Sequence, residues 1–233
     1  MIEQSYTVKH QDTTMYGKMR TSALFSLMTD MLVEDMERKG AGVSVLLKKN
    51  TMLIAVRVYT EIARMPEFGE TVNAKSWAGR TRSVLFPRFF TLTDGQGRRI
   101  VSATALWTLA DTETRHFVFP KERGVSITGD EEEEELRLPP QMEKLPLTHS
   151  ASLTAPFSYI DINGHLSNMH YFDVVENTLP DAASGLQLKK INVEYSGEIL
   201  PGSEFSLSWG EDGNRRFITG SGEKRYFSMN LEY

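Results

Sequence analysis

Apolar side chains recur every three or four positions in two separate stretches of the chain, which predicts two amphipathic helices. The apolar positions are Leu24, Leu27, Met28 and Met31 in the first stretch and Met169, Phe172 and Val175 in the second. Thr21 and Asn168 precede these stretches, and both residue types can accept a hydrogen bond from a free backbone N–H at a helix start. We expect them to cap the two helices, and we expect Pro180 to end the second one.

Each predicted helix is followed by segments typical of β-strands. They are rich in β-branched and aromatic residues, or they alternate between apolar and polar positions. Asp94-Gly95 marks a hairpin turn between two strand-like runs. The strand-like segments are 52–62, 71–79 and 85–111 after the first helix, and 188–197, 203–222 and 225–233 after the second.

The two helix regions belong to a weak internal repeat. Residues 17–32 align with residues 164–179, and a segment that ends at Trp77 aligns with one that ends at Trp209. The period is too long for a solenoid, so two copies of one domain fit better. One long helix followed by several antiparallel strands predicts a sheet wrapped around a central helix. We therefore expect an α+β chain made of two hotdog folds in tandem.

Residues 128–147 separate the two copies and have the composition of a linker. They combine six consecutive acidic residues, from Asp130 to Glu135, with Pro139-Pro140 and few large apolar side chains. This composition predicts a solvated connector, and a docking site for a basic partner is the alternative. The expected domains are an N-terminal hotdog over residues 1–127 and a C-terminal hotdog over residues 148–233.

Composition narrows the classes of function. Of the 233 residues, 40% are hydrophobic and 24% are charged, which is typical of a globular protein. The formal net charge of −5 comes largely from the acidic run, so nothing indicates a nucleic-acid surface. No apolar run approaches the roughly 20 residues that a membrane span needs, and the first residues lack the apolar stretch of a signal peptide. We therefore expect a cytoplasmic protein without stable membrane insertion.

The chain has no cysteine. This excludes disulfides, thiolate metal ligands and a cysteine nucleophile.

Candidate chemistry is confined to the second copy. The candidates are Asp161, Asn163 and His165 on the loop that leads into the second helix, and Glu198 at the end of the next strand. Lys18 and Met65 stand at the positions of His165 and Glu198 in the first copy, so these two candidates are not part of the repeat. An imidazole can move a proton near neutral pH, a carboxylate can activate water, and N–H groups at a helix start can hold an oxyanion.

These residue types together indicate a site that activates water, and acyl transfer to water is the simplest reaction for it. On the residues alone, Asn163-Gly164 is also compatible with a simple turn.

The same residues resemble a motif of the acyl-ACP thioesterase family. That family carries Asp-x-Asn-x-His-x-Asn-Asn on the loop before a helix and Glu-Tyr-x-x-Glu on the next strand. This chain has DINGHLSN at 161–168 and EYSGE at 194–198. Residues 69–94 and 105–120 resemble the tryptophan-containing strand, the Arg-Phe strand and the Trp-x-x-x-Asp strand of the family. The resemblance therefore covers most of the chain and implies a tandem double hotdog.

The resemblance implies a role for each candidate. Asn163 would orient or polarise the thioester, His165 would assist proton transfer, and Asp161 would fix the loop. Glu198 would act as the base for the attacking water or as the nucleophile. The N-terminal hotdog would be the acyl-chain side of the molecule, and the C-terminal hotdog would carry the catalytic residues.

Two positions depart from the family pattern. Ser167 stands at the first asparagine of the Asn-Asn pair, and Ile199 follows Glu198 where many plant relatives carry cysteine. A mechanism based on a thiolate cannot apply to a chain without cysteine. The Glu198 carboxylate is therefore expected to act as the base or the nucleophile in place of a thiolate.

The expected function is hydrolysis of the thioester of fatty acyl-acyl carrier protein, which releases free fatty acid and ends chain elongation. No metal or diffusible cofactor is expected, because the substrate itself carries phosphopantetheine. The expected partners are acyl carrier protein and the acyl thioester, and homodimer formation stays open. The alternatives are an acyl-CoA thioesterase, a 3-hydroxyacyl dehydratase or enoyl hydratase with a hotdog fold, and a non-catalytic acyl binder. Matched acyl-CoA substrates would separate the first, and a dehydratase would release no free thiol.

Four methionines near the first helix allow two interpretations. Met19, Met28, Met31 and Met36 are most simply core residues. The family resemblance adds the alternative that they line an adaptable tunnel for an acyl chain.

Overall fold

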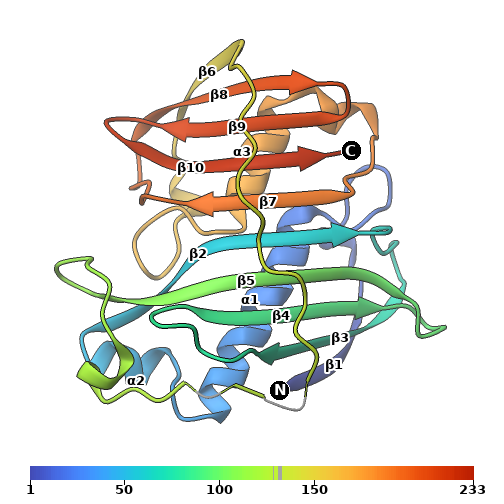
Figure 1. Ribbon diagram of the computed structural model, residues 1–233. Coiled ribbons are helices and arrows are strands. Elements are labelled where there is room, and N and C mark those ends of the chain that lie inside the picture. The colour runs from blue at the N-terminus through green and yellow to red at the C-terminus, as the bar shows by residue number, and fades with distance from the viewer. Residues whose placement is uncertain (128, 131–132) are drawn as a thin grey trace.

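One continuous antiparallel sheet organises the computed structural model, which describes residues 1–127, 129–130 and 133–233 (Figure 1). Three residues of the predicted linker, Thr128, Glu131 and Glu132, lie outside the described residues. The elements of the first half are β1 (Ile2–Thr7), α1 (Thr21–Arg38), α2 (Val43–Lys48), β2 (Thr51–Ile62), β3 (Thr71–Ala78), β4 (Phe86–Thr93) and β5 (Arg99–Asp111). Those of the second are β6 (His149–Thr154), α3 (His170–Thr178), β7 (Lys190–Tyr195), β8 (Glu204–Asp212), β9 (Arg215–Ser221) and β10 (Arg225–Glu232).

The strand order repeats the same topology twice. Within the described residues the sheet runs β1-β3-β4-β5-β2-β7-β10-β9-β8-β6, so the second half follows the order of the first in reverse. The halves join where β2 pairs with β7, from Arg57 opposite Glu194 to Glu61 opposite Lys190. The prediction of two hotdog folds in tandem is confirmed, and the two folds share one sheet.

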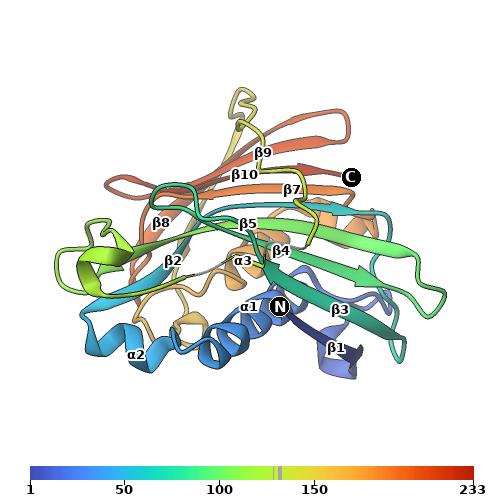
Figure 2. The same ribbon diagram turned by 60° about the horizontal axis from the view of Figure 1, so that its bottom comes forward.

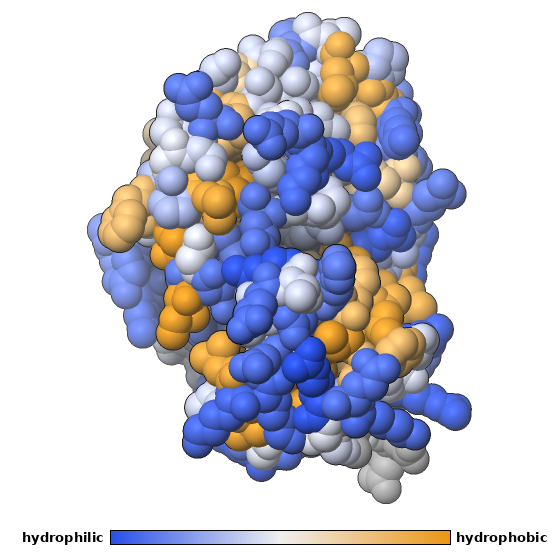
Figure 3. Space-filling view, turned by 90° about the vertical axis from the view of Figure 1, so that its left-hand side faces the viewer, coloured by the Kyte–Doolittle hydropathy of each residue, from blue (hydrophilic) through white to orange (hydrophobic). Residues whose placement is uncertain are grey.

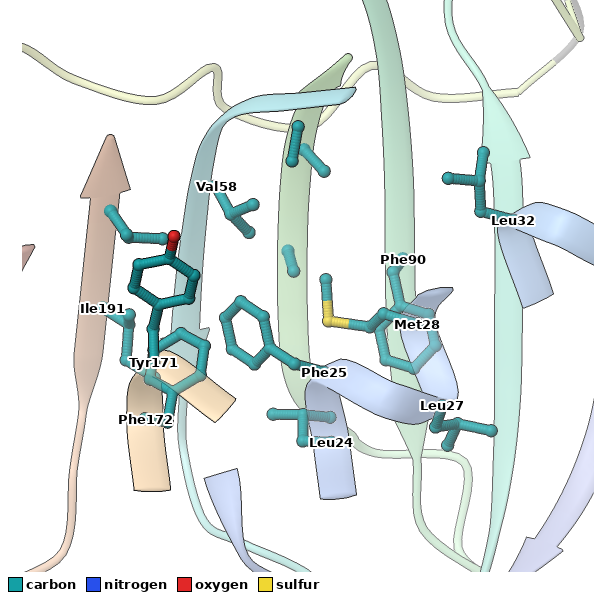
Figure 4. Close-up of a cluster of buried hydrophobic side chains, with 14 of the residues drawn as sticks. Leu24, Phe25, Leu27, Met28, Leu32, Val58, Phe90, Tyr171, Phe172 and Ile191 are labelled. Atoms are coloured by element: carbon teal, nitrogen blue, oxygen red, sulfur yellow. The ribbon is translucent and has the colours of Figure 1, made fainter. Parts of the chain in front are cut away.

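The long helices cover one face of the sheet, as Figure 2 shows from below. The predicted apolar face of α1 is buried, with Leu24 and Met31 fully enclosed. Figure 4 shows Phe25 and Met28 of α1 pointing toward the strands, with Phe172 of α3 beside Phe25. The ring centroids of Phe25 and Phe172 are 4.0 Å apart, so the two central helices meet in one shared core.

The predicted helix caps are wrong in both halves. Helix α1 begins at Thr21 itself, with Arg20 as the N-cap residue, and the Thr21 hydroxyl bonds the Glu176 carboxylate of α3 instead. Helix α3 begins at His170 with Met169 as its N-cap residue, so Asn168 lies one residue too early to cap it. Neither start has a side-chain cap, which means that tertiary packing holds these helix ends.

The segment between the halves crosses the face of the sheet opposite the helices, where Figure 1 draws it in yellow in front of the strands. Polar contacts fix it along this path. The Trp77 indole N–H donates to the Glu134 carbonyl at 2.8 Å, Asn192 donates to the Pro140 carbonyl at 3.2 Å, and the Asn230 amide bonds the backbone of Glu143. The segment between the halves therefore packs against the sheet.

The described acids of the connector are also paired with cations of the first half. Their partners are Lys39 for Asp130, Lys75 for Glu133, Arg99 for Glu134 and Arg82 for Glu135. The prediction of a solvated acidic segment is thus only partly right, because these carboxylates form ion pairs with lysine and arginine side chains of the N-terminal hotdog. Acids already paired in this way do not support the alternative of a docking site for a basic partner.

Candidate active site

A tight turn shapes the loop from Asp161 to His165. The Asp161 N–H donates to the His165 carbonyl at 3.0 Å, and the Gly164 N–H donates to the Asp161 carbonyl at 3.0 Å. Gly164 has a φ of 81°, a conformation that residues with a Cβ rarely adopt, so glycine is strongly favoured there. The Asp161 carboxylate accepts the Asn163 backbone N–H at 2.8 Å and the Asn163 side-chain amide at 3.4 Å. Asp161 therefore holds Asn163 in place, in keeping with the loop-fixing role predicted for it.

A backbone hydrogen bond brings this loop to Glu198. The Leu166 N–H donates to the Ile199 carbonyl at 2.8 Å, and the Met19 N–H makes the same bond to the Pro66 carbonyl at 2.8 Å in the first half. In each half, the same backbone hydrogen bond therefore joins the loop before the helix to the segment that follows the next strand. The prediction that places Glu198 at the end of the strand is off by three residues, because β7 already ends at Tyr195.

The imidazole and the carboxylate face each other across this junction. His165 Nε2 lies 3.8 Å from Glu198 Oε1, too far for a direct hydrogen bond. Nε2 is buried and has no hydrogen-bond partner within the described residues, whereas Nδ1 lies 3.4 Å from the Leu166 carbonyl. A proton on Nδ1 would leave the Nε2 lone pair directed toward Glu198.

Arg115 joins the site from the N-terminal half. Its Nη1 atom lies 3.5 Å from Glu198 Oε1. Sequence reasoning missed this residue, which stands 83 positions before Glu198 in the chain and has no spacing signal toward it.

The four predicted residues and Arg115 open onto one large cavity of about 540 Å³, which lies within the size range of small-molecule sites. It extends from the Asp161–His165 loop into the N-terminal half, along α1, α2 and β2. Its apolar walls include Leu32, Val33, Met36, Val43, Leu46, Leu47, Met52, Leu53, Ile54, Ala55, Val56, Trp107 and Met169. Of the four methionines considered above, only Met36 lines this cavity, while Met19 and Met31 are core residues.

The mouth of the cavity has an apolar rim. Leu47, Phe117 and Ile162 line it and are also exposed, Ile162 at 88%. Figure 3 views the side of the molecule that carries the loops on the left of Figure 1, and hydrophobic side chains interrupt its hydrophilic surface in several places. Lys224 contributes a cation to the same lining.

Tyr171, which is buried, and Tyr195, which is partly buried, line the cavity beside the polar residues. Burial raises the pKa of Tyr171, and the charges of Glu198 and Asp161 raise it further. Burial likewise raises the pKa of Tyr195 well above its usual value, and its hydroxyl donates to the Asn168 carbonyl at 3.3 Å. Both phenols therefore stay protonated and can act as hydrogen-bond donors.

Glu194 of the second motif serves the sheet. Its carboxylate pairs with Arg57 directly across the β2–β7 junction and lies 3.5 Å from Arg225. This position of the motif therefore holds the two halves together and does not face the cavity, whereas Ser167 and Asn168 line it.

Neither a cluster of metal-binding side chains nor a membrane-spanning helix is found among the described residues. No three His, Asp or Glu side chains among them come together as a metal site. None of the described helices is long and apolar enough to cross a membrane.

The fold and the site define a class of protein. Two hotdog halves share one sheet, and an Asp/Asn/His loop of the second half faces a glutamate at the entrance to an apolar cavity of the first. The chain belongs to the acyl-ACP thioesterase family. The family model for the acyl-ACP thioesterase N-terminal domain matches residues 1–122, and that for the C-terminal domain matches residues 143–222.

Curated relatives of the chain include plant enzymes. A palmitoyl-acyl carrier protein thioesterase of Cuphea hookeriana is 22% identical over 66% of this chain, and a dodecanoyl-[acyl-carrier-protein] hydrolase of Cinnamomum camphora is 24% identical over 68%. The chain spans only 39% and 44% of the length of these two relatives.

Solved structures share the fold. The 12:0-ACP thioesterase from Umbellularia californica superposes with a TM-score of 0.82 and 19% identity, covering 99% of this chain and 96% of that one. An acyl-ACP thioesterase from Bacteroides thetaiotaomicron gives a TM-score of 0.81 with 18% identity, again over 99% and 96% of the two chains.

Proposed function

We propose that this protein hydrolyses the thioester of fatty acyl-acyl carrier protein and releases free fatty acid. The observation that carries the proposal is the pair formed by His165 Nε2 and Glu198 Oε1, 3.8 Å apart at the entrance of a cavity with apolar walls. Family membership and the printed names of the plant relatives support the same substrate.

Atoms at this separation suit the activation of water. A water molecule placed roughly 2.8 Å from both could donate one hydrogen bond to the Glu198 carboxylate and one to His165 Nε2. In the hydrolytic step, the water oxygen attacks the thioester carbonyl carbon and its proton passes to Glu198. The carbon–sulfur bond then breaks, and the proton that Glu198 took from the water passes through His165 Nε2 to the thiolate of the phosphopantetheine arm, which returns both residues to their starting states. Attack by the Glu198 carboxylate itself, followed by hydrolysis of the anhydride, uses the same residues.

The remaining polar residues act on the carbonyl group. Asp161 holds Asn163 through its backbone and its side chain, so the second hydrogen of the Asn163 amide is available to polarise the thioester oxygen. Phosphopantetheine belongs to the substrate in this scheme, and the absence of a diffusible cofactor stays a prediction.

The cavity suits the apolar part of the substrate. Each methylene that it takes from water contributes about 0.8 kcal/mol of binding. Acyl carrier protein, as an acidic partner, would be held outside the mouth, where Arg115 and Lys224 supply positive charge. Release of the fatty acid would end chain elongation. The cytoplasmic location stays a prediction, and homodimer formation stays open.

The test is thiol release from a panel of acyl-acyl carrier proteins, with matched acyl-CoA substrates alongside. Glu198→Gln and His165→Asn keep the shape of each side chain and remove its acid–base function. Each should lower kcat by roughly 100-fold or more. Glu204→Gln changes an exposed acid of β8 and serves as the control, with activity near that of the unchanged protein.

Two results would contradict the proposal. One is hydrolysis near the original rate by a folded Glu198→Gln protein, which would remove that carboxylate from the mechanism. The other is faster release from acyl-CoA than from acyl-acyl carrier protein, which would favour the acyl-CoA alternative.

A further inference from the structure

The short hairpin that carries Asp161, Asn163 and His165 has a counterpart in the first half. In residues 159–167, here called the site hairpin, the backbone N–H of the last residue donates to the carbonyl of the first at 2.9 Å, and in residues 12–20 the same bond measures 2.7 Å. An isolated antiparallel bridge follows inside each of them. The two hairpins are therefore equivalent, so a side-chain contact that occurs in only one of them is not needed to form the turn.

Two bonds hold the first hairpin against the segment that follows β2. The Phe68 N–H donates to the Gly17 carbonyl at 2.9 Å, and Lys18 forms an ion pair with Glu67. The backbone bond that both halves share aligns Phe68 with Pro201, which has no N–H to donate. The position of Lys18 is taken by the imidazole of the candidate pair, which stands 3.8 Å from its carboxylate and makes no direct bond to it. The site hairpin is therefore held less firmly on this side than its counterpart.

An aromatic stack holds the site hairpin on its other side. The ring of Tyr159, at the base of the hairpin, stacks on the imidazole of His170, with centroids 4.2 Å apart and planes 6° from parallel. His170 is the first residue of α3, and its Nδ1 atom donates to the Asp173 carboxylate at 2.6 Å, which fixes the plane of the imidazole. The stack is specific to the second half, because Ala23 has no ring. The residues at the three positions in the first half are Asp12, Ala23 and Ser26.

We infer that His170, oriented by Asp173, is a positioning residue that holds the site hairpin through Tyr159. The described residues that line the large cavity include none of these three, so they act on the reaction only through the hairpin. The stack keeps His165 Nε2 at 3.8 Å from Glu198 Oε1, the separation that a bridging water needs. The inference rests on the proposed thioesterase function and adds a residue that supports it from outside the cavity.

Two substitutions remove the same stack from its two sides. Contact between two rings changes an equilibrium roughly 2- to 10-fold, so Tyr159→Ala and His170→Ala should each lower kcat by that factor. Because neither side chain reaches the cavity, KM should stay within roughly twofold of its original value. The double variant should be no slower than the slower single variant, because one contact is lost in all three proteins.

A conservative variant and a matched control accompany these measurements. His170→Phe keeps a ring against Tyr159 and should restore most of kcat. His149→Ala is the control, because His149 is also a stacked histidine of the second half, with its ring 5.2 Å from that of Trp209 and its Nδ1 atom 2.9 Å from the Thr148 hydroxyl. It does not line the cavity, and its removal should leave kcat unchanged.

A second measurement does not depend on activity. The Ser167 N–H donates to the Tyr159 carbonyl and the Asp161 N–H donates to the His165 carbonyl, so both amides report opening of the site hairpin. In His170→Ala their hydrogen exchange should accelerate roughly 2- to 10-fold, while exchange in β9 stays as it was. Acceleration of equal size in β9 would mean that His170 stabilises the whole half and does not position the hairpin.

The outcomes distinguish the two proposals. Losses of kcat that multiply in the double variant, or a His170→Ala protein with the original kcat and the original exchange at Ser167, would overturn the positioning role and leave the thioesterase function intact. A His170→Phe protein as slow as His170→Ala would also overturn it. Failure of the unchanged protein to hydrolyse any acyl-acyl carrier protein would contradict the function itself and this inference with it.

Discussion

At the scale of single residues, Arg115 is a contact through which the N-terminal half reaches Glu198. Arg115 adopts a φ of 61°, uncommon for a residue with a side chain, and such conformations persist only when the surroundings enforce them. Asp111 enforces it: one carboxylate oxygen accepts the backbone N–H groups of Glu113 and Thr114, at 3.0 and 2.8 Å. These two bonds, with help from Arg123, lower the pKa of Asp111 to about 2, so its charge is permanent near neutral pH.

Arg115→Ala should therefore reduce turnover by leaving Glu198 less firmly oriented. We expect kcat to fall by up to roughly fivefold with little change in KM, since a partly exposed ion pair contributes up to about 1 kcal/mol. Arg115→Lys keeps the charge and should recover most of the loss. Steady-state kinetics on one acyl-acyl carrier protein measure both, with Arg215→Ala as the control, because Arg215 pairs with Asp212 and Glu143 instead. A rise in KM at constant kcat would show that Arg115 binds substrate and does not position Glu198.

The sequence could predict the local part of this site and not the distant part. Asp161, Asn163 and His165 are close in the chain, and a glycine turn brings them together whatever the rest of the fold does. Glu198 could be placed through the repeat, because the same backbone bond occurs in both halves. The contact of Arg115 depends on how two distant loops meet across the sheet, and no periodicity encodes that.

At the scale of elements, burial explains which strands could be predicted from the sequence. The central strands alternate or carry apolar runs because they cover the helices, and they were predicted close to their observed bounds. Strands β1 and β6 lie at the two edges of the sheet and were missed. Each has only one or two large apolar residues, since one face and one edge meet solvent, so the pattern is too weak to read.

A buried ion pair, Asp35 with Arg88, joins α1 to β4. Asp35 is 2% exposed, and burial alone would raise its pKa, but the Arg88 and Lys39 cations lower it to about 2. Asp35→Asn leaves Arg88 buried without its counter-charge and should lower the free energy of unfolding at pH 7 by about 3–5 kcal/mol. Chemical denaturation measures this. Glu34→Gln, at an exposed acid of the same helix paired with Arg38, should cost less than about 1 kcal/mol.

The effect of Asp35→Asn on the free energy of unfolding should depend on pH in a defined direction. Because the pKa of Asp35 is lower in the folded than in the unfolded protein, its ionised form stabilises the fold above pH 4 and this contribution is lost as the pH falls toward 2. The stability difference between the original protein and Asp35→Asn should therefore shrink over that range. A difference that stays constant down to pH 2 would show that the charge of Asp35 is not what stabilises the fold.

At the scale of the whole molecule, the two hotdog folds are parts of one structure. They share a sheet at β2 and β7, a core where Phe25 meets Phe172, and a connector that lies across both halves. The sequence repeat predicted two units and a linker between them, because duplication is visible as similarity. It could not predict that the units fuse, since edge pairing between β2 and β7 leaves no signal in either copy.

Because the two halves share a sheet and a core, we expect them to unfold together. Phe25→Ala removes the ring that α1 places against α3, and truncating a buried phenylalanine costs about 3–5 kcal/mol. If the two folds form one cooperative unit, amide hydrogen exchange should accelerate equally in β4 and in β9, although Phe25 belongs to the first half alone. Phe68→Ala, at a residue that is 60% exposed, should leave both strands unchanged. Faster exchange in β4 with unaltered protection in β9 would mean that each hotdog is stable by itself, and the large cavity of the first half could then open without disturbing the sheet of the second half.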